Sequence, residues 1–113
     1  MPKMIQRAEP QRAQQTVVSR TLVAPPRPSF DCRYAQTPVE LAICADPVLA
    51  GKDWRMALLY EQRGGSRYRP IDERQWRWLA AREACARAPR TRLEACISQT
   101  YDARIAELSS SRR

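Results

Sequence analysis

The sequence predicts a small all-α domain in which disulfide bonds staple one short helix and three longer ones into a bundle. Two observations predict it. Every segment with clear hydrophobic periodicity has the helical spacing of three or four residues, and four cysteines lie among or beside those segments. No stretch shows the alternation and composition of a β-strand. With 113 residues, the chain has room for one core only.

An extended N-terminal arm is expected over residues 1–29, which are rich in Gln, Arg, Ala and Pro and end in a proline-rich stretch at 24–28. The arm holds five bases and one acid, residues 109–113 hold two bases, and residues 30–108 hold 13 bases against 11 acids. The formal net charge of +8 therefore lies mostly outside the expected helical domain, 30–108. This distribution favours solvated basic tails and makes a nucleic-acid partner unlikely.

The first helix is expected from Pro38 to about Ala45. Thr37 stands at the N-cap, Pro38 at the first helical position and Glu40 at the third, which is the pattern of a capping box. The pattern satisfies backbone N–H groups that have no partner inside the helix. This is the short helix of the bundle.

The second helix is expected to begin at Asp46-Pro47, which repeats the same start signal, and to end at Gly64-Gly65. Trp54 lies early in this helix, where a role in packing competes with a role in contacting a partner. The side chains that can share one broad apolar face are Leu49, Met56, Leu59 and Tyr60.

The third helix is expected to begin at residues 70–72 and to end before Pro89, and the fourth to begin near Arg90 or Thr91. On the third helix, the periodic positions are Gln75, Trp78, Leu79, Arg82, Cys85 and Ala86. On the fourth, they are Leu93, Cys96, Ile97, Thr100, Tyr101, Ile105 and Leu108. Trp76 is two residues from Trp78, so we expect it to be exposed on another face.

The four cysteines indicate two disulfides. No two of them have the Cys-x-x-Cys spacing, and the chain has no histidine. Neither a zinc site nor a redox dithiol is therefore expected. Of three possible connectivities, we favour Cys32–Cys44 and Cys85–Cys96. The first joins the segment before the first helix to the end of that helix, and the second joins the third and fourth helices across Pro89. Each loop of about a dozen residues should contribute roughly 3 kcal/mol of stability.

Two disulfides indicate an oxidising compartment. Residues 1–20 lack the apolar core of a signal peptide, and no stretch is long and apolar enough to span a membrane. We therefore expect that the sequence is part of a longer exported protein or that its start is misassigned. The expected location is periplasmic or extracellular.

Polar residues on the apolar helix faces are expected to fix helix packing. The absence of histidine excludes His-based triads and proton shuttles, and an Asp–Arg pair or a Gln-to-backbone bond explains Asp53, Gln75, Arg82 and Glu83 better than catalysis does. We expect no catalytic residue, no metal and no cofactor. The residues assigned to the structural core are Asp53, Tyr60, Gln75, Trp78, Arg82 and Tyr101.

Several motifs between Ser29 and Leu108 resemble the LprI-like lysozyme inhibitor family. In the first half they are Ser29-Phe30-Asp31-Cys32, Thr37-Pro38-Val39-Glu40, Ala42-Ile43-Cys44-Ala45-Asp46-Pro47, and Asp53 with Tyr60. In the second half they are Gln75-x-x-Trp78-Leu79-x-x-Arg82-Glu83-x-Cys85, Cys96-Ile97, Tyr101 and Arg104-Ile105-x-Glu107-Leu108. One departure is Gly51-Lys52, where the family has an apolar residue before its Asp. The resemblance implies a helical, disulfide-bonded domain of the bacterial cell envelope and lysozyme inhibition.

A protein-binding role is the function we expect. The segment between the second and third helices carries Arg67, Tyr68 and Arg69 beside a glycine pair, and such side chains are favoured at interfaces. They could enter the carboxylate-lined cleft of a lysozyme-type glycan hydrolase, and Trp54 and Trp76 are further candidate contacts. Because common animal lysozymes are basic, inhibition would need local charge complementarity. The alternative is a structural or accessory interaction domain of a larger envelope assembly.

Overall fold

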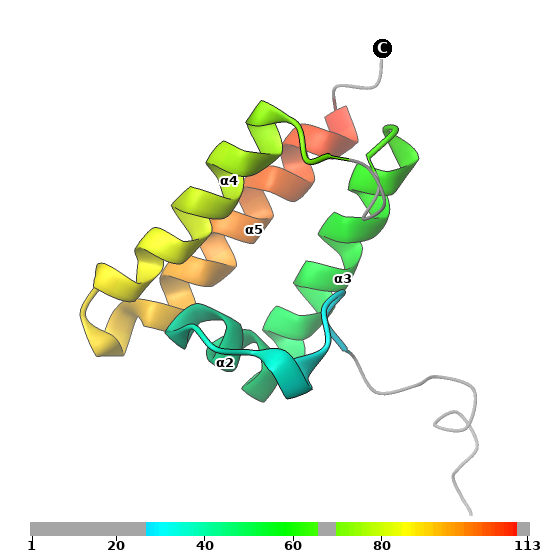
Figure 1. Ribbon diagram of the computed structural model, residues 1–113. Helices are drawn as coiled ribbons and strands as arrows, with labels where there is room; N and C mark the ends of the chain where they lie inside the picture. The colour runs from blue at the N-terminus through cyan, green and yellow to red at the C-terminus, as the bar shows by residue number, and fades with distance from the viewer. Residues whose placement is uncertain (1–26, 66–69, 111–113) are drawn as a thin grey trace, which may run out of the picture.

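The computed structural model describes residues 27–65 and 70–110, and within these ranges the protein is an all-α bundle without strands (Figure 1). The fold class expected from the sequence is confirmed. The α-helices are α2 (Pro38–Ala45), α3 (Pro47–Gln62), α4 (Glu73–Ala84) and α5 (Leu93–Ser110). Three 3₁₀ turns accompany them: η1 (Cys32–Tyr34), η2 (Cys85–Arg87) and η3 (Arg90–Arg92).

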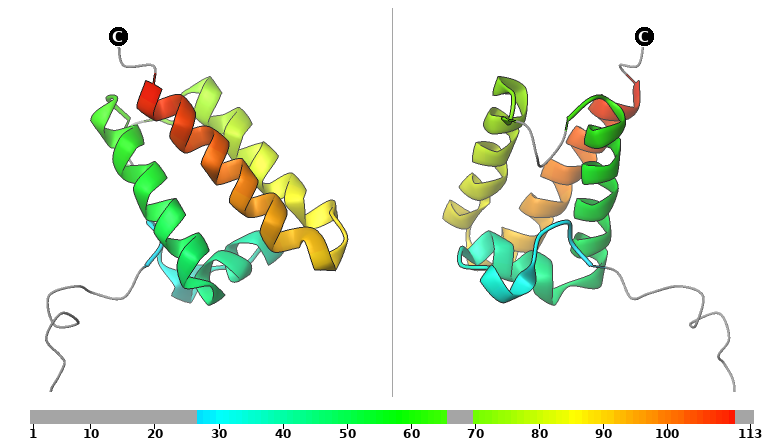
Figure 2. Two further views of the ribbon diagram at one scale, coloured as in Figure 1. Left: turned by 180° about the vertical axis from the view of Figure 1, so that it is seen from behind. Right: turned by 45° about the vertical axis from the view of Figure 1, so that its right-hand side comes forward.

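The longest helix, α5, lies at the centre of the arrangement. Helix α4 runs antiparallel beside it, and α3 packs along another side of it (Figures 1 and 2). The short α2 lies across the end of the bundle where α3 and α5 begin. Residues far apart in the sequence therefore meet along α5.

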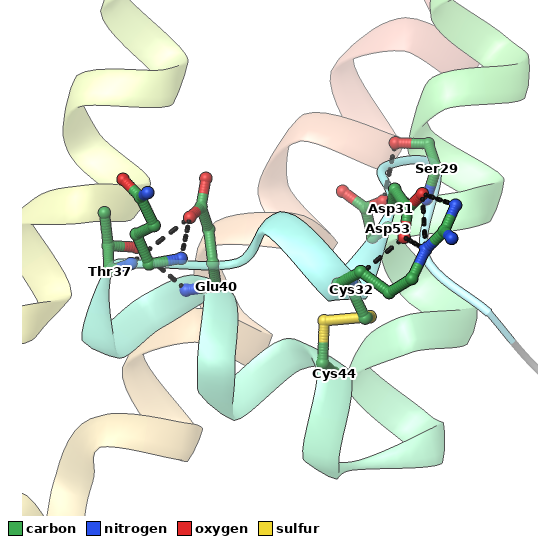
Figure 3. Close-up of a disulfide and its surroundings, with 9 residues drawn as sticks. Ser29, Asp31, Cys32, Thr37, Glu40, Cys44 and Asp53 are labelled. Atoms are coloured by element: carbon green, nitrogen blue, oxygen red, sulfur yellow. Dashed lines mark hydrogen bonds and ion pairs between the residues drawn. A yellow bond between two sulfur atoms is a disulfide. The ribbon is translucent and has the colours of Figure 1, made fainter.

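Side-chain caps begin the first three α-helices, as the sequence predicts for α2 and α3. In α2, the Glu40 backbone N–H donates to Thr37 Oγ1 at 3.0 Å, and Glu40 Oε1 accepts from the Thr37 backbone at 3.2 Å (Figure 3). The Asp46 carboxylate accepts from the backbone N–H of Val48 at the start of α3. At the start of α4, Asp72 caps in the same way.

The end of α3 requires glycine. Gly64 has φ +99°, which is in the left-handed region that only glycine adopts readily. A Cβ atom on Gly65 would overlap the ring of Tyr60, so a side chain at this position would force the half-buried ring to move. The predicted end of the second helix at Gly64-Gly65 agrees with this geometry.

Three boundaries differ from those expected. Helix α4 ends at Ala84, and Cys85–Arg87 continue as a tighter 3₁₀ turn. The cause is Pro89, which holds the preceding Ala88 in an extended conformation (ψ 158°). Helix α5 begins at Leu93 rather than near Arg90 or Thr91, because residues 90–92 form a 3₁₀ turn before it. It runs to Ser110, two residues beyond the helical domain expected to end at residue 108.

The core lies between α3, α4 and α5 and is covered at one end by α2. Trp78 is 8% exposed, and its ring meets that of Tyr101 edge to face at 5.0 Å. Tyr60 is half-buried at the edge of this core and packs against it. The buried hydrophobic cluster comprises Val39, Ile43, Leu49, Met56, Trp78, Cys85, Ile97, Tyr101 and Leu108.

Both favoured disulfides are present. Cys32–Cys44 joins η1 to α2 (Figure 3), and Cys85–Cys96 joins η2 to α5. They span 12 and 11 residues of sequence, respectively. The structure therefore has one covalent link at the start of the described fold and one between its two adjacent antiparallel helices.

Candidate functional site

The first candidate site is a polar network centred on the carboxylate of Asp53, which is only 1% exposed. Its Oδ2 atom accepts hydrogen bonds from the backbone N–H of Ser29 at 2.6 Å and from the Ser29 hydroxyl at 2.7 Å (Figure 3). Its Oδ1 atom accepts from the hydroxyl of Tyr101 at 2.5 Å. Both carboxylate oxygens are thus occupied by groups of the protein.

Arg82, 6% exposed, supplies the positive charge of this network. Its Nη1 atom donates to the Tyr101 hydroxyl at 3.1 Å and lies 3.9 Å from Asp53 Oδ1. Its Nη2 atom donates to Glu83 Oε2 at 2.7 Å, and the ring of Phe30 lies 6.0 Å from the guanidinium carbon. The expected Asp–Arg pair therefore exists, with the Tyr101 hydroxyl bonded to both partners.

The Tyr101 hydroxyl stays protonated in this position. Burial, followed by the negative charge of Asp53, raises the pKa of Tyr101 above its ordinary value of 10.0. The neutral hydroxyl donates its proton to Asp53 and accepts a hydrogen bond from Arg82. It acts as a fixed link between α3, α4 and α5.

A second buried cluster connects Gln75 of α4 with Arg104 of α5. Arg104 is 5% exposed and donates from Nε and Nη2 to Gln75 Oε1 at 3.2 and 2.8 Å, and from Nη1 to Glu107 at 2.7 Å. The Gln75 amide nitrogen lies 3.7 Å from the sulfur of Met56. The expected Gln-to-backbone bond is wrong for this side chain, because a buried guanidinium needs the amide oxygen as its acceptor.

These two clusters account chemically for the buried charges. Asp53, Arg82 and Arg104 each contact groups of opposite charge or complementary polarity, as buried ions require. Among the described residues, no group of three or more His, Cys, Asp or Glu side chains could hold a metal ion. The arrangement can fix the packing of the helices and the position of the segment at Ser29.

A hollow of about 350 Å³ lies between the ends of α3, α4 and α5. Arg104, which lines it, is already bonded to Gln75 and Glu107. The lining alternates in charge and consists of Tyr60, Arg63, Asp72, Glu73, Arg74, Arg104, Glu107 and Leu108. With three acids and three arginines, it favours neither anions nor cations.

Both remaining tryptophans lie on outer helix faces. Trp54 on α3 is 56% exposed, so of its two expected roles the packing role does not apply within the described residues. Trp76 on α4 is 59% exposed, as expected from its offset from Trp78. Arg67, Tyr68 and Arg69, the other candidate contacts, lie outside the described residues.

Sequence reasoning missed two partners in the buried clusters. It assigned Ser29 to the arm, whereas Ser29 bonds to Asp53, so the folded part begins before Phe30. It gave Arg104 no role, although Arg104 falls on the same helical stripe as Ile97, Tyr101 and Leu108. A basic residue in phase with a buried stripe was the signal that could have identified it.

The fold and the buried clusters define a small, all-α, disulfide-bonded protein. No helix among the residues described is long and apolar enough to cross a membrane. No family model matches the sequence, and neither a curated protein nor a solved structure matches it.

Proposed function

We propose that this is a non-enzymatic protein of the bacterial cell envelope that acts by binding another protein, in the manner of the LprI-like lysozyme inhibitors. The observation that carries the proposal is that the buried charged groups bond to one another while two aromatic side chains are exposed. The buried Asp53, Arg82 and Arg104 are bonded within the protein, whereas Trp54 and Trp76 are held outward on a covalently linked helical frame.

The rigid frame suits recognition. A surface that is already ordered loses little conformational entropy on binding, and exposed tryptophans can bury a large area in an interface. The two disulfides support a location in an oxidising compartment, periplasmic or extracellular. The motifs between Ser29 and Leu108 support the family.

The partner we propose is a lysozyme-type glycan hydrolase, which cleaves its substrate with two carboxylates in a cleft. Arg67, Tyr68 and Arg69 are the proposed contacts from the sequence, and Trp54 and Trp76 are the exposed aromatic contacts. An accessory interaction domain of a larger envelope assembly is the alternative. In that role, the same surfaces of this protein would bind an envelope protein that is not a hydrolase.

The test uses the oxidised full chain in two parallel assays. In one, lysozymes of several types hydrolyse cell walls with and without the protein. In the other, the immobilised protein captures binding proteins from an envelope extract. Dose-dependent inhibition of at least one lysozyme supports the proposal, and specific capture of a non-hydrolase envelope protein without inhibition supports the alternative. If the protein inhibits no lysozyme and captures no envelope protein, both the proposal and the alternative are overturned.

A matched variant tests the contacts. Replacing Arg67, Tyr68 and Arg69 together by Ala should leave the melting temperature unchanged, because the sequence assigns them no part in the core and surface substitutions shift stability by less than about 0.5 kcal/mol each. Affinity for the inhibited lysozyme should fall about thirtyfold, corresponding to the loss of about 2 kcal/mol from one desolvated arginine. Unchanged affinity would exclude this segment and direct attention to Trp54 and Trp76.

A further inference from the structure

We propose that the bundle end formed by α2 and the α4–α5 connection is a docking surface for an acidic protein segment that carries a bulky apolar side chain. The surface consists of residues 87–92, which we call the arginine turn, and an adjoining apolar hollow. The inference rests on the proposed protein-binding function and specifies the chemistry of the partner.

The arginine turn concentrates positive charge that no ion pair among the described residues neutralises. Arg87, Arg90 and Arg92 are all exposed. No ion pair joins any of these three to another residue within 27–65 and 70–110. By contrast, Arg82 and Arg104 both bind acids.

The turn is also rigid, because the Cys85–Cys96 disulfide joins its two sides and the Cα atoms of the two cysteines are 5.7 Å apart. Pro89 restricts the backbone between them further. The arginines are therefore presented from a frame that needs little ordering on binding, which lowers the entropic cost of an interface.

A mainly apolar hollow of about 580 Å³ adjoins the arginine turn at Arg90, between α2 and the start of α5. Leu41 in its wall is 52% exposed, so its apolar side chain is open to a partner beside the charge of Arg90. Figures 1 and 2 show α2 lying beside the α4–α5 connection at this end of the bundle. The hollow is lined by Pro38, Leu41, Ala42, Arg90, Thr91, Leu93 and Glu94.

Arg87 follows the C-terminal end of α4, where a cation is favourable, but helix stability does not account for Arg90 and Arg92. Arg90 and Arg92 directly precede α5, whose N-terminal end carries the positive pole of the helix dipole, and cations are unfavourable at that pole. Glu94 is the only acid in the first turn of α5, so the three arginines outnumber it. An acidic partner would remove this repulsion.

The charges and the hollow together identify the occupant. Carboxylates of an acidic segment would contact the arginines, and a leucine-sized side chain between them would enter the hollow and pack against Leu41. The net charge of +8 repels basic partners at long range, which favours a locally acidic one. A nucleic acid would use the arginines but has no aliphatic side chain for the hollow.

The test measures binding of a fluorescein-labelled peptide, Glu-Asp-Glu-Leu-Glu-Asp-Glu, to the oxidised full chain by fluorescence anisotropy. Arg87→Gln, Arg90→Gln and Arg92→Gln combined should weaken binding at least tenfold. The control combines Arg55→Gln, Arg74→Gln and Arg77→Gln, which removes the same charge from exposed sites elsewhere and should change binding less than twofold. Equal weakening by both variants would overturn the proposal.

The apolar part has its own pair of variants. Leu41→Ser should weaken binding about fivefold, whereas Leu58→Ser, at a leucine 45% exposed on α3, should leave it unchanged. Replacing the central leucine of the peptide by glycine should reproduce the effect of Leu41→Ser. If neither Leu41→Ser nor the glycine-substituted peptide weakens binding, or if an oligothymidylate binds more tightly than the peptide, the proposal is overturned in favour of a general polyanion site.

The result also separates this inference from the proposed function. A lysozyme or envelope partner that binds the arginine-turn variant as tightly as the unchanged protein would refute this docking surface and leave the protein-binding function intact. Loss of that partner in the arginine-turn variant, with the control variant unaffected, would support both.

Discussion

The carboxylate of Asp53 shows how a charge is accommodated inside a small core. Burial of an unpaired carboxylate costs several kcal/mol, so its oxygens need donors. Two of the donors come from Ser29, 24 residues earlier in the chain, and one from Tyr101, 48 residues later. One side chain thus links the segment before η1 to α3 and α5.

Tyr101→Phe should measure how much this hydrogen-bonded link contributes to the free energy of unfolding. The substitution keeps the aromatic packing but removes the hydroxyl that bonds to Asp53 and Arg82, leaving buried charged groups short of a partner. We expect a loss of about 1–3 kcal/mol in the free energy of unfolding, measured by urea denaturation.

The matched control is Tyr60→Phe. The Tyr60 hydroxyl donates to Asp72 at 3.2 Å near the surface, where water can replace it, so the loss should be under about 1 kcal/mol. If the two variants lose equal stability, the buried network does not contribute as the geometry indicates.

At this scale, sequence patterns identified the side chains better than their partners. The helical spacing placed Gln75, Trp78 and Arg82 on one face, and all three are buried. The partners Ser29 and Arg104 come from distant parts of the chain, and a pattern along one helix carries no information about which distant atoms complete its hydrogen bonds.

Helix boundaries, in contrast, depend on local chemistry and were largely predictable. The capping box of Thr37 and Glu40 and the Asp46-Pro47 start signal bond only to backbone groups a few residues away. Helices α2 and α3 begin at these motifs. The end of α4 was less predictable, because the shift to a 3₁₀ turn at Cys85 also involves the constraint from Pro89 and the disulfide.

The capping box predicts a pH dependence of stability. The backbone N–H of Gln36, and then that of Thr37, lowers the pKa of Glu40 below its ordinary value of 4.5. A lowered pKa in the folded state means that this contribution is fully present above pH 4.5 and is lost as the pH falls through the folded-state pKa. Between pH 6 and pH 3, the unfolding free energy should therefore fall.

Glu40→Gln isolates this effect, because glutamine accepts the same hydrogen bonds but does not titrate. Its unfolding free energy should fall less between pH 6 and pH 3 than that of the unchanged protein, measured by chemical denaturation at each pH. The control is Glu61→Gln, which replaces an exposed acid outside the helix caps. The pH dependence of its unfolding free energy should match that of the unchanged protein. A Glu40→Gln curve parallel to both would contradict the role of the cap.

For the whole molecule, the balance between a small core and two covalent links determines stability. Each disulfide constrains the unfolded chain through a loop of about a dozen residues. Cys85→Ser with Cys96→Ser, or Cys32→Ser with Cys44→Ser, should each lower the unfolding free energy by about 3 kcal/mol in urea denaturation.

Mass spectrometry provides the accompanying check. Alkylation without reductant should add no mass, and digestion should yield peptides that join Cys32 to Cys44 and Cys85 to Cys96. Peptides with crossed pairs, or double variants as stable as the unchanged protein, would show that the links do not stabilise the fold as described.

The Cys85–Cys96 bond also changes the effect of a break in the backbone. Arg87, Arg90 and Arg92 are accessible cleavage sites for a trypsin-like protease, and all three lie within the covalent ring. A single cut after any of them adds one water molecule and releases no fragment, since the disulfide still joins α4 to α5. At this end of the bundle, a single nick thus leaves the two helices attached.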